Sequence, residues 1–362
     1  MSERLVPIRK FDFSRLDCLI GALLCSLALA YGVGYRRGSQ PAEKDKQAAE
    51  DAAVAAAAVD VVENASKQPS AEILAVKGAD PKEKAWEKMT DELEHLAAGH
   101  RGRVAIYLQD LKTNKTWTFH PDDLFPSASL IKVPVMACVF SKIHDGGLSL
   151  NDTLTLRKRN RVGGSGTLKW RNEGSRFTVR ELLGHMISES DNTATAMLIE
   201  AMGIGYVQQQ FPKMGLFYTE LYPEGMSLNG GRVAHENYTT AREMTMLMQK
   251  IYNGELVDRD SSELMLDILK HKKPTASRLA KGLPAGWSIA HKTGLLRQAC
   301  HDSAVIMAPT GDYALTVLTG QNTSYRVAKD FITRLGRITF RHYRGEYYVA
   351  KAGRRHSQLA VR

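Results

Sequence analysis

The chain has strand-like sequence near both ends of its folded region and helix-like sequence between them. Alternating apolar and polar residues predict strands over 103–111 and 116–120, and again over 287–293, 302–308 and 313–319. Strands so far apart in the chain share one sheet only if the residues between them form a separate block. We therefore predict an α+β fold, with an antiparallel sheet from both chain ends and an inserted all-helical subdomain.

The residues between the two strand groups have the apolar spacing of helices. Two further helices, over 85–96 and 326–341, flank the strands. A cleft is expected where the sheet meets the helical block. The middle helices are predicted over 178–189, 193–202, 239–252 and 261–271, with Thr178 and Thr239 or Thr240 as N-caps.

The two ends of the chain differ in composition from its middle. Residues 18–35 carry no charge and follow several basic residues, which is typical of a membrane anchor or a signal segment behind a short cytoplasmic tail. Residues 36–81 are rich in alanine and charged residues, lack aromatic side chains and predict a spacer. We expect one folded domain over 82–345 and a basic tail over 346–362.

The apolar segment 18–35 permits two interpretations. As a helix it is roughly 27 Å long, which is enough to cross a hydrocarbon core. Against an anchor, Ala28-Leu29-Ala30 is the A-x-A pattern of a cleaved secretory signal. We favour the membrane anchor, and we expect no lipid on Cys25 because large side chains precede it.

The basic character of the chain does not indicate a nucleic-acid partner. The net charge is +10, but basic residues cluster at the chain ends and no basic motif is interleaved with aromatic side chains. Cys138 and Cys300 are predicted to be small buried thiols. The histidines lack metal-binding spacing, so neither a metal nor another cofactor is expected, and we expect a monomer.

The only S-x-x-K pattern in the chain runs from Ser129 to Lys132 and opens an apolar stretch that is predicted to be a buried helix. A serine and a lysine three residues apart then share one face of the helix. The lysine nitrogen comes within hydrogen-bonding reach of the hydroxyl, and backbone N–H groups at the helix start stabilise negative charge. The pattern therefore indicates a serine nucleophile that is activated without histidine.

The triplet Ser190-Asp191-Asn192 lies where one predicted helix ends and the next begins. An ordinary N-cap is the alternative interpretation, since all three residue types favour that position. In a cleft, the Ser190 hydroxyl can relay a proton to a leaving nitrogen, and the Asn192 amide can hold both a lysine and a substrate amide. Asp191 is predicted to pin the loop.

The triplet Lys292-Thr293-Gly294 ends an apolar strand and is the only K-T-G in the chain. An edge strand offers backbone groups to an extended substrate, and Gly294 lets that backbone come close. Lys292 and Thr293 are candidates for binding a substrate carboxylate. The N–H of Leu295 is predicted to form an oxyanion hole with that of Ser129.

The three motifs, in this order, resemble the signature of class A β-lactamases and penicillin-binding proteins. The resemblance implies a β-lactamase/transpeptidase-like fold and a covalent acyl-enzyme. It implies that Ser129 attacks, that Lys132 helps to accept its proton and that Ser190 relays a proton. The implied substrate is a β-lactam or a D-Ala-D-Ala-like peptide. Such substrates lie outside the cytoplasm, so we expect the domain on the periplasmic side of a bacterial membrane.

One departure concerns the second half of the reaction. Class A β-lactamases hydrolyse the acyl-enzyme with a glutamate in an E-x-x-L-N loop. Here Leu228 and Asn229 match the end of that pattern, but Gly225 stands where the glutamate is expected and Glu224 lies one position early. Glu224 is the candidate for this role. If it does not reach the site, Ser129 keeps penicillin as a long-lived adduct, as transpeptidases and carboxypeptidases do.

A second departure is the pair His301-Asp302, which stands where many β-lactamases carry a glycine-rich or arginine-bearing segment. The pair, and the glycine-rich stretch over 162–166, resemble less-characterised serine hydrolases related to class A. His301 is a candidate donor to a substrate carboxylate, and Arg297 is a rival cation for that contact. The alternative is a structural histidine that is satisfied by Asp302.

Other function classes fit less well. A Ser-His-Asp hydrolase with G-x-S-x-G is excluded because the nearest stretch, over 163–167, fails at its last position. A non-catalytic peptidoglycan-binding module with the same fold stays open. Labelling of Ser129 by a fluorescent penicillin separates an enzyme from such a module.

The predicted role of Lys132 requires that its pKa be lowered, which burial and the nearby charge of Lys292 both favour. Because only the neutral amine accepts a proton, we expect the acylation rate of Ser129 to rise with pH between about pH 5 and about pH 9. Stopped-flow acylation by a chromogenic β-lactam measures this profile. A rate that is constant across the range contradicts a lysine base.

Overall fold

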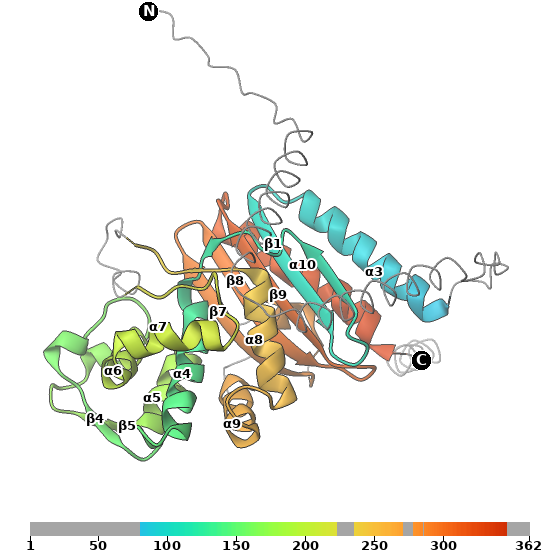
Figure 1. Cartoon of the computed structure of the whole chain (residues 1–362). Helices are drawn as coiled ribbons and strands as arrows, with labels where there is room; N and C mark the ends of the chain where they lie inside the picture. The colour runs from blue at the N-terminus through green and yellow to red at the C-terminus, as the bar shows by residue number, and fades with distance from the viewer. Residues whose placement is uncertain (1–79, 223–234, 271–277, 285, 346–362) are drawn as a thin grey trace, which may run out of the picture. The chain divides into compact units, whose positions relative to one another are not determined.

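The computed structural model describes residues 80–222, 235–270, 278–284 and 286–345. A five-stranded antiparallel sheet with the order β2-β1-β9-β8-β7 crosses this region (Figure 1). The pairing of β1 with β9 along the full length of each joins the two ends of the domain, as predicted. The strands are β1 (Arg103–Asp110), β2 (Thr116–Phe119), β7 (Ser288–Leu296), β8 (Ala299–Met307) and β9 (Tyr313–Gly320).

Helices cover both faces of the sheet. On one face α3 (Pro81–Ala98) and α10 (Tyr325–Tyr343) pack side by side, and their apolar residues form one buried cluster with the sheet. On the other face α8 (Ala241–Asn253) packs against β1, β8 and β9 and joins a second, larger cluster with the helical block. The two clusters bury the sheet from both sides.

The block inserted between β2 and β7 is largely helical, which confirms the predicted architecture (Figure 1). Two pairs of very short strands in this region were not predicted, because segments of two or three residues are too short to show alternation. Its helices are α4 (Lys132–His144), α5 (Val179–Ser188), α6 (Asn192–Met202), α7 (Ile204–Lys213) and α9 (Arg259–Lys270). The short strands are β3 (Phe125–Pro126), β4 (Thr153–Thr155), β5 (Arg176–Thr178) and β6 (Tyr238–Thr239).

Helix starts follow the capping residues that the sequence provides. The Thr178 hydroxyl accepts a hydrogen bond from the Glu181 N–H, and the Glu181 carboxylate reaches back to Thr178, which forms a capping box. Of the two residues proposed to cap α8, Thr240 is the N-cap. Asp80 caps α3 directly before Pro81, a residue that suits the first helical position.

The β7–β8 hairpin differs from its prediction. The strand was expected to stop at Thr293, but β7 continues through Gly294 to Leu296, and β8 begins at Ala299 instead of residue 302. The glycine was interpreted as a strand end, whereas it pairs in register with His301. The two-residue turn is made possible by Gln298, which adopts a φ of 62°.

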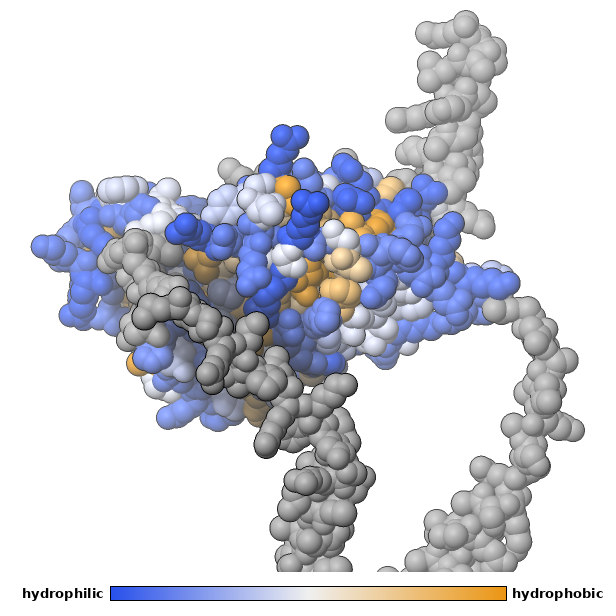
Figure 2. All heavy atoms as spheres, turned by 90° about the horizontal axis from the view of Figure 1, so that it is seen from above, coloured by the Kyte–Doolittle hydropathy of each residue, from blue (hydrophilic) through white to orange (hydrophobic). Residues whose placement is uncertain are grey.

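The predicted anchor over 18–35, almost all of the spacer and the basic tail lie outside the described residues. In the part of the chain that is described, no helix has the length and apolar character needed to span a membrane. Cys138 and Cys300 are buried and unbridged, as predicted. The described surface in Figure 2 is mainly hydrophilic, with apolar side chains gathered near its middle.

A close backbone contact holds α10 against the segment that leads into β7. A methyl group at Gly336 would lie 2.5 Å from the Leu279 carbonyl oxygen, whereas one at Gly184 in α5 would meet no atom within 4 Å. We expect Gly336→Ala to lower the free energy of unfolding by about 1–3 kcal/mol. The control Gly184→Ala should raise it by roughly 0.5–1 kcal/mol, because alanine favours helix. Urea denaturation measures both, and equal stabilities would contradict the contact.

Candidate active site

The predicted nucleophile Ser129 lies in a 3₁₀ turn, η1 (Ala128–Ile131), that leads directly into α4. The predicted buried helix is confirmed as α4, and the 3₁₀ turn before it was not predicted. In a 3₁₀ turn, side chains three residues apart lie over one another. Lys132 Nζ accordingly donates a hydrogen bond to Ser129 Oγ at 3.1 Å. Ala128 has a φ of 49°, a strained conformation for a residue with a Cβ atom.

The Lys132 side chain is buried and reaches a second segment of the chain. Its Nζ donates to Asn192 Oδ1 at 2.6 Å and to the Ser190 carbonyl oxygen at 2.8 Å, and it lies 3.3 Å from Ser190 Oγ. The amine therefore joins Ser129 to the loop that precedes α6. This arrangement brings two of the three predicted motifs together.

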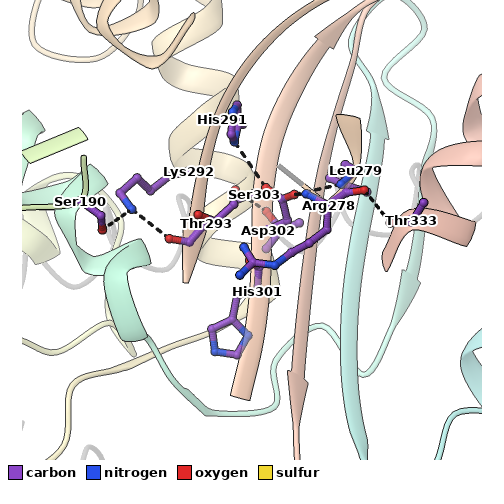
Figure 3. Close-up of polar contacts among 11 residues, drawn as sticks. Ser190, Arg278, Leu279, His291, Lys292, Thr293, His301, Asp302, Ser303 and Thr333 are labelled. Carbon is purple, nitrogen blue, oxygen red and sulfur yellow. Dashed lines mark hydrogen bonds and ion pairs between the residues drawn. The ribbon is translucent and has the colours of Figure 1, made fainter. Parts of the chain in front are cut away.

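Lys292 of β7 reaches Ser190 in the same loop (Figure 3). Its buried Nζ donates to Ser190 Oγ at 2.9 Å and to the Thr293 carbonyl oxygen at 2.9 Å. The Ser190 hydroxyl thus lies between two lysine amines, and Ser190 has a φ of 57°. Two ammonium ions this close would repel each other.

Asp191 fixes the loop, as predicted. Its buried carboxylate accepts hydrogen bonds from the Ala194 N–H at 2.9 Å, as the N-cap of α6, and from the Leu168 N–H at 2.8 Å. A methyl group at Gly166, where φ is 95°, would lie 2.1 Å from the Asp191 carboxyl carbon. Only glycine permits this approach of the neighbouring loop.

Gly294 brings β7 close to the turn that carries Ser129. A methyl group at Gly294 would lie 3.0 Å from the Ala128 Cβ atom and 3.3 Å from the Ser127 carbonyl oxygen. The following residue, Leu295, lies on the edge strand of the five-stranded sheet with its side chain exposed. Its role in an oxyanion hole stays a prediction.

The structure corrects the prediction for His301. The ring is fully buried, its Nε2 lies 2.8 Å from the Pro126 carbonyl oxygen, and its Nδ1 accepts a hydrogen bond from the Thr319 N–H at 3.2 Å. Both nitrogens are therefore occupied, so His301 supports β3 and β9 and does not donate to a substrate. Its partner is also not Asp302. The rival cation Arg297 is exposed at the β7–β8 turn.

A buried polar cluster behind Lys292 was missed by the sequence reasoning (Figure 3). The Asp302 carboxylate accepts hydrogen bonds from the backbone N–H groups of Arg278 and Leu279, at 2.7 and 3.0 Å, and lies 3.7 Å from His291 Nδ1. Burial opposes ionisation of Asp302, but His291 and Arg278 hold its pKa below the usual range. No motif marks Arg278, whose Nη1 donates to the His301 carbonyl oxygen.

Residues 88–343 match the model of the β-lactamase enzyme family. The chain belongs to this family. It is 23% identical to β-lactamase VEB-1 of Pseudomonas aeruginosa over 71% of this chain and 91% of that protein. It is 28% identical to a β-lactamase of Streptomyces albus G over 66% of this chain and 78% of that protein.

Solved structures of the family have the same fold. PBP-A is 27% identical, with a TM-score of 0.64 over 70% of this chain and 95% of that chain. A β-lactamase from Sphaerobacter thermophilus is 25% identical, with a TM-score of 0.64 over 70% of this chain and 96% of that chain. The predicted β-lactamase/transpeptidase-like fold is thereby confirmed, and the chain is a β-lactamase-like serine hydrolase.

The remaining predicted residue of this β-lactamase relative, Glu224, lies outside the described residues, so its role stays a prediction. The residues on either side of 223–234 are held together. The Tyr222 N–H donates to Asn237 Oδ1 at 2.6 Å, and the Tyr222 and His235 rings stack with centroids 5.0 Å apart. The Asn237 carbonyl oxygen in turn accepts a hydrogen bond from the Ser127 N–H at 2.7 Å. The described residues that flank 223–234 are therefore linked to the turn that carries Ser129.

Among the described residues, no group of three or more histidine, cysteine, aspartate or glutamate side chains is placed to hold a metal ion. The buried pair of His291 and Asp302 alone does not form such a group.

Burial lowers the pKa of His301 from 6.5 to about 4. Between these values the unfolded chain takes up a proton that the folded chain does not, so the free energy of unfolding falls as the pH falls. The loss reaches about 3 kcal/mol below pH 4 and is absent above pH 6.5. Because the Gln amide can replace both hydrogen bonds without titrating, His301→Gln should flatten this part of the profile. Denaturation at several pH values tests it, and parallel profiles would contradict the assignment.

Proposed function

We propose that the chain opens β-lactams through an acyl-enzyme on Ser129. The observation that carries the proposal is the position of Lys132 Nζ, which is hydrogen-bonded to Ser129 Oγ, Ser190 and Asn192 at the same time. In this proposal Ser129 Oγ forms a bond to the lactam carbonyl carbon as its proton passes to Lys132. The carbon–nitrogen bond then breaks, and the nitrogen takes a proton through the Ser190 hydroxyl.

Substrate binding is assigned to the edge of β7. Lys292 and Thr293 bind the substrate carboxylate, and the Asn192 amide binds the substrate amide oxygen. The N–H groups of Ser129 and Leu295 stabilise the oxyanion. The close approach of Gly294 to Ala128 supports this assignment, because Leu295 and Ser129 are the residues that directly follow these two.

The second candidate function is that of a penicillin-binding protein that retains its adduct. Two observations favour it. Glycine stands at the position of the hydrolytic glutamate in the E-x-x-L-N pattern. PBP-A is among the similar structures, and a substituted form of PBP-A is described as an acyl-enzyme complex with penicillin G. In this case the natural ligand is a D-Ala-D-Ala-like peptide, and Glu224 does not supply the water.

The proposal places the domain outside the cytoplasm, where its substrates occur. Residues 18–35 serve as an anchor in the inner membrane, or as a signal that is removed on export, and residues 36–81 hold the domain away from the membrane. The domain acts as a monomer without a cofactor.

The test is to mix the full chain with nitrocefin and with penicillin G, and to follow turnover and protein mass. We expect one penicillin per chain on Ser129, no adduct with Ser129→Ala and acylation slower by at least about 100-fold with Lys132→Ala. The matched control Lys112→Ala, at an exposed position away from the site, should acylate at the normal rate. Failure of the unchanged protein to form any adduct would favour a non-catalytic binding module.

The lifetime of the adduct separates the two enzymatic functions. Rapid turnover that Glu224→Gln converts into a stable adduct indicates a β-lactamase, with Glu220→Gln as the control. A stable adduct in the unchanged protein indicates a penicillin-binding protein.

A further inference from the structure

Residues 157–176, here called the basic loop, carry a dense cluster of positive charge. The basic loop contains seven lysine or arginine side chains and one acidic side chain, Glu173. It runs from the end of β4 to the start of β5 at the edge of the helical block. Like charges concentrated on a surface repel one another, and an anionic partner relieves that repulsion.

Part of this charge is already used within the domain. Arg157 and Arg159 face the Glu200 carboxylate, and Arg161 donates hydrogen bonds to the backbone carbonyl oxygens of Lys169 and Arg171 at 2.8 Å each. These contacts shape the basic loop but do not neutralise it.

Three other cations of the basic loop point to solvent. The side chains of Lys158, Arg171 and Arg176 are exposed, and within the described residues they make no ion pair. In Figure 2, hydrophilic residues dominate the visible surface at the end of the molecule that holds the helical block. The structure therefore leaves at least three positive charges of the basic loop available to a ligand.

The basic loop also exposes a large aromatic side chain. Trp170 is 79% exposed, and Lys169 Nζ lies 5.4 Å from the centre of its ring. An indole that remains this exposed offers an apolar face with a polar edge, which is the type of side chain that dominates recognition surfaces. Beside free cations, it suits a ligand that combines carboxylates with apolar surface.

The basic loop is connected to the candidate active site by direct hydrogen bonds. Asn192 Nδ2 donates to the Gly163 carbonyl oxygen at 2.8 Å, and the Asn192 N–H donates to the Ser165 carbonyl oxygen at 3.1 Å. The Leu168 N–H is held by Asp191, and Trp170 follows two residues later. An extended peptide advances roughly 3.3 Å per residue, so a ligand of three to five residues spans roughly 10–17 Å from the group that Asn192 binds.

We propose that the basic loop is a subsite for an acidic leader, meaning several carboxylate-bearing residues on the amino side of the substrate amide that Asn192 binds. The inference rests on the proposed function of Ser129 and Asn192. One Asn192 amide hydrogen is bonded to Gly163, and the other is directed to the substrate amide oxygen. The leader then lies over Trp170, with its carboxylates beside Lys158, Arg171 and Arg176. The preferred acyl donor is thus an acidic peptide or glycopeptide.

The test uses two acyl donors that share one reactive ring. 6-Aminopenicillanic acid is acylated on its amino group with a triglutamate or with a triglutamine peptide, and the acylation rate of the full chain is measured by mass. At low salt the glutamate donor should react about five- to tenfold faster, because exposed charge pairs each contribute a small factor. At about 0.3 M salt the ratio should approach one.

Variants assign the preference to the basic loop. The combined changes Lys158→Gln, Arg171→Gln and Arg176→Gln should bring the ratio close to one without slowing the glutamine donor. The matched control removes three exposed arginines from α10, by Arg326→Gln, Arg334→Gln and Arg337→Gln, and should keep the preference. Trp170→Ala should slow both donors alike, and Trp170→Phe should restore part of the rate.

The outcomes are distinct from those of the proposed function. Equal acylation of the unchanged protein by both donors at low salt, or loss of the preference in the α10 control, overturns the acidic subsite and leaves the acyl-enzyme intact. If neither donor forms an adduct with Ser129, the proposed function fails, and the subsite fails with it.

Discussion

The buried amine of Lys132 is the interaction on which the site depends. An amine removed from water is costly unless polar atoms surround it, and here those atoms come from η1, from the loop before α6 and from Asn192. Separate contacts hold the lysine and the loop in place. The apolar residues of α4 fix the lysine, and the Asp191 carboxylate fixes the loop. The folded core therefore sets the geometry at Ser129.

The sheet supplies the other wall of the site through its edge strand. Lys292 is aimed at Ser190 because β7 pairs in register with β8, and β8 is anchored by the buried cluster of Asp302, His291 and Arg278. Buried ionisable residues thus occur both at the site, as Lys132 and Lys292, and in this cluster. A buried ion pair contributes little net stability. In this domain the buried cluster fixes the position of the strand that carries Lys292 and Thr293.

Much of the fold and of the site could be predicted from the sequence, since alternation, helical spacing and three short motifs are local signals. The fold brings five predicted residues together: Ser129 and Lys132 lie where α4 begins, Ser190 and Asn192 lie where α6 begins, and Lys292 lies within β7. The errors arose where the deciding partner is distant in the sequence. His301 is held by Pro126 and Thr319, and Arg278 reaches the cluster without any motif. Burial and long-range pairing cannot be deduced from neighbours in the chain.

Asn237 connects two parts of the domain that lie far apart in the sequence. Its side chain accepts a hydrogen bond from the Tyr222 N–H and its carbonyl oxygen accepts one from the Ser127 N–H, so one buried residue holds both a residue that flanks 223–234 and the turn that carries Ser129. A change at Asn237 would therefore disturb the turn that carries Ser129 and the residues that flank 223–234 together, because both depend on this one buried residue.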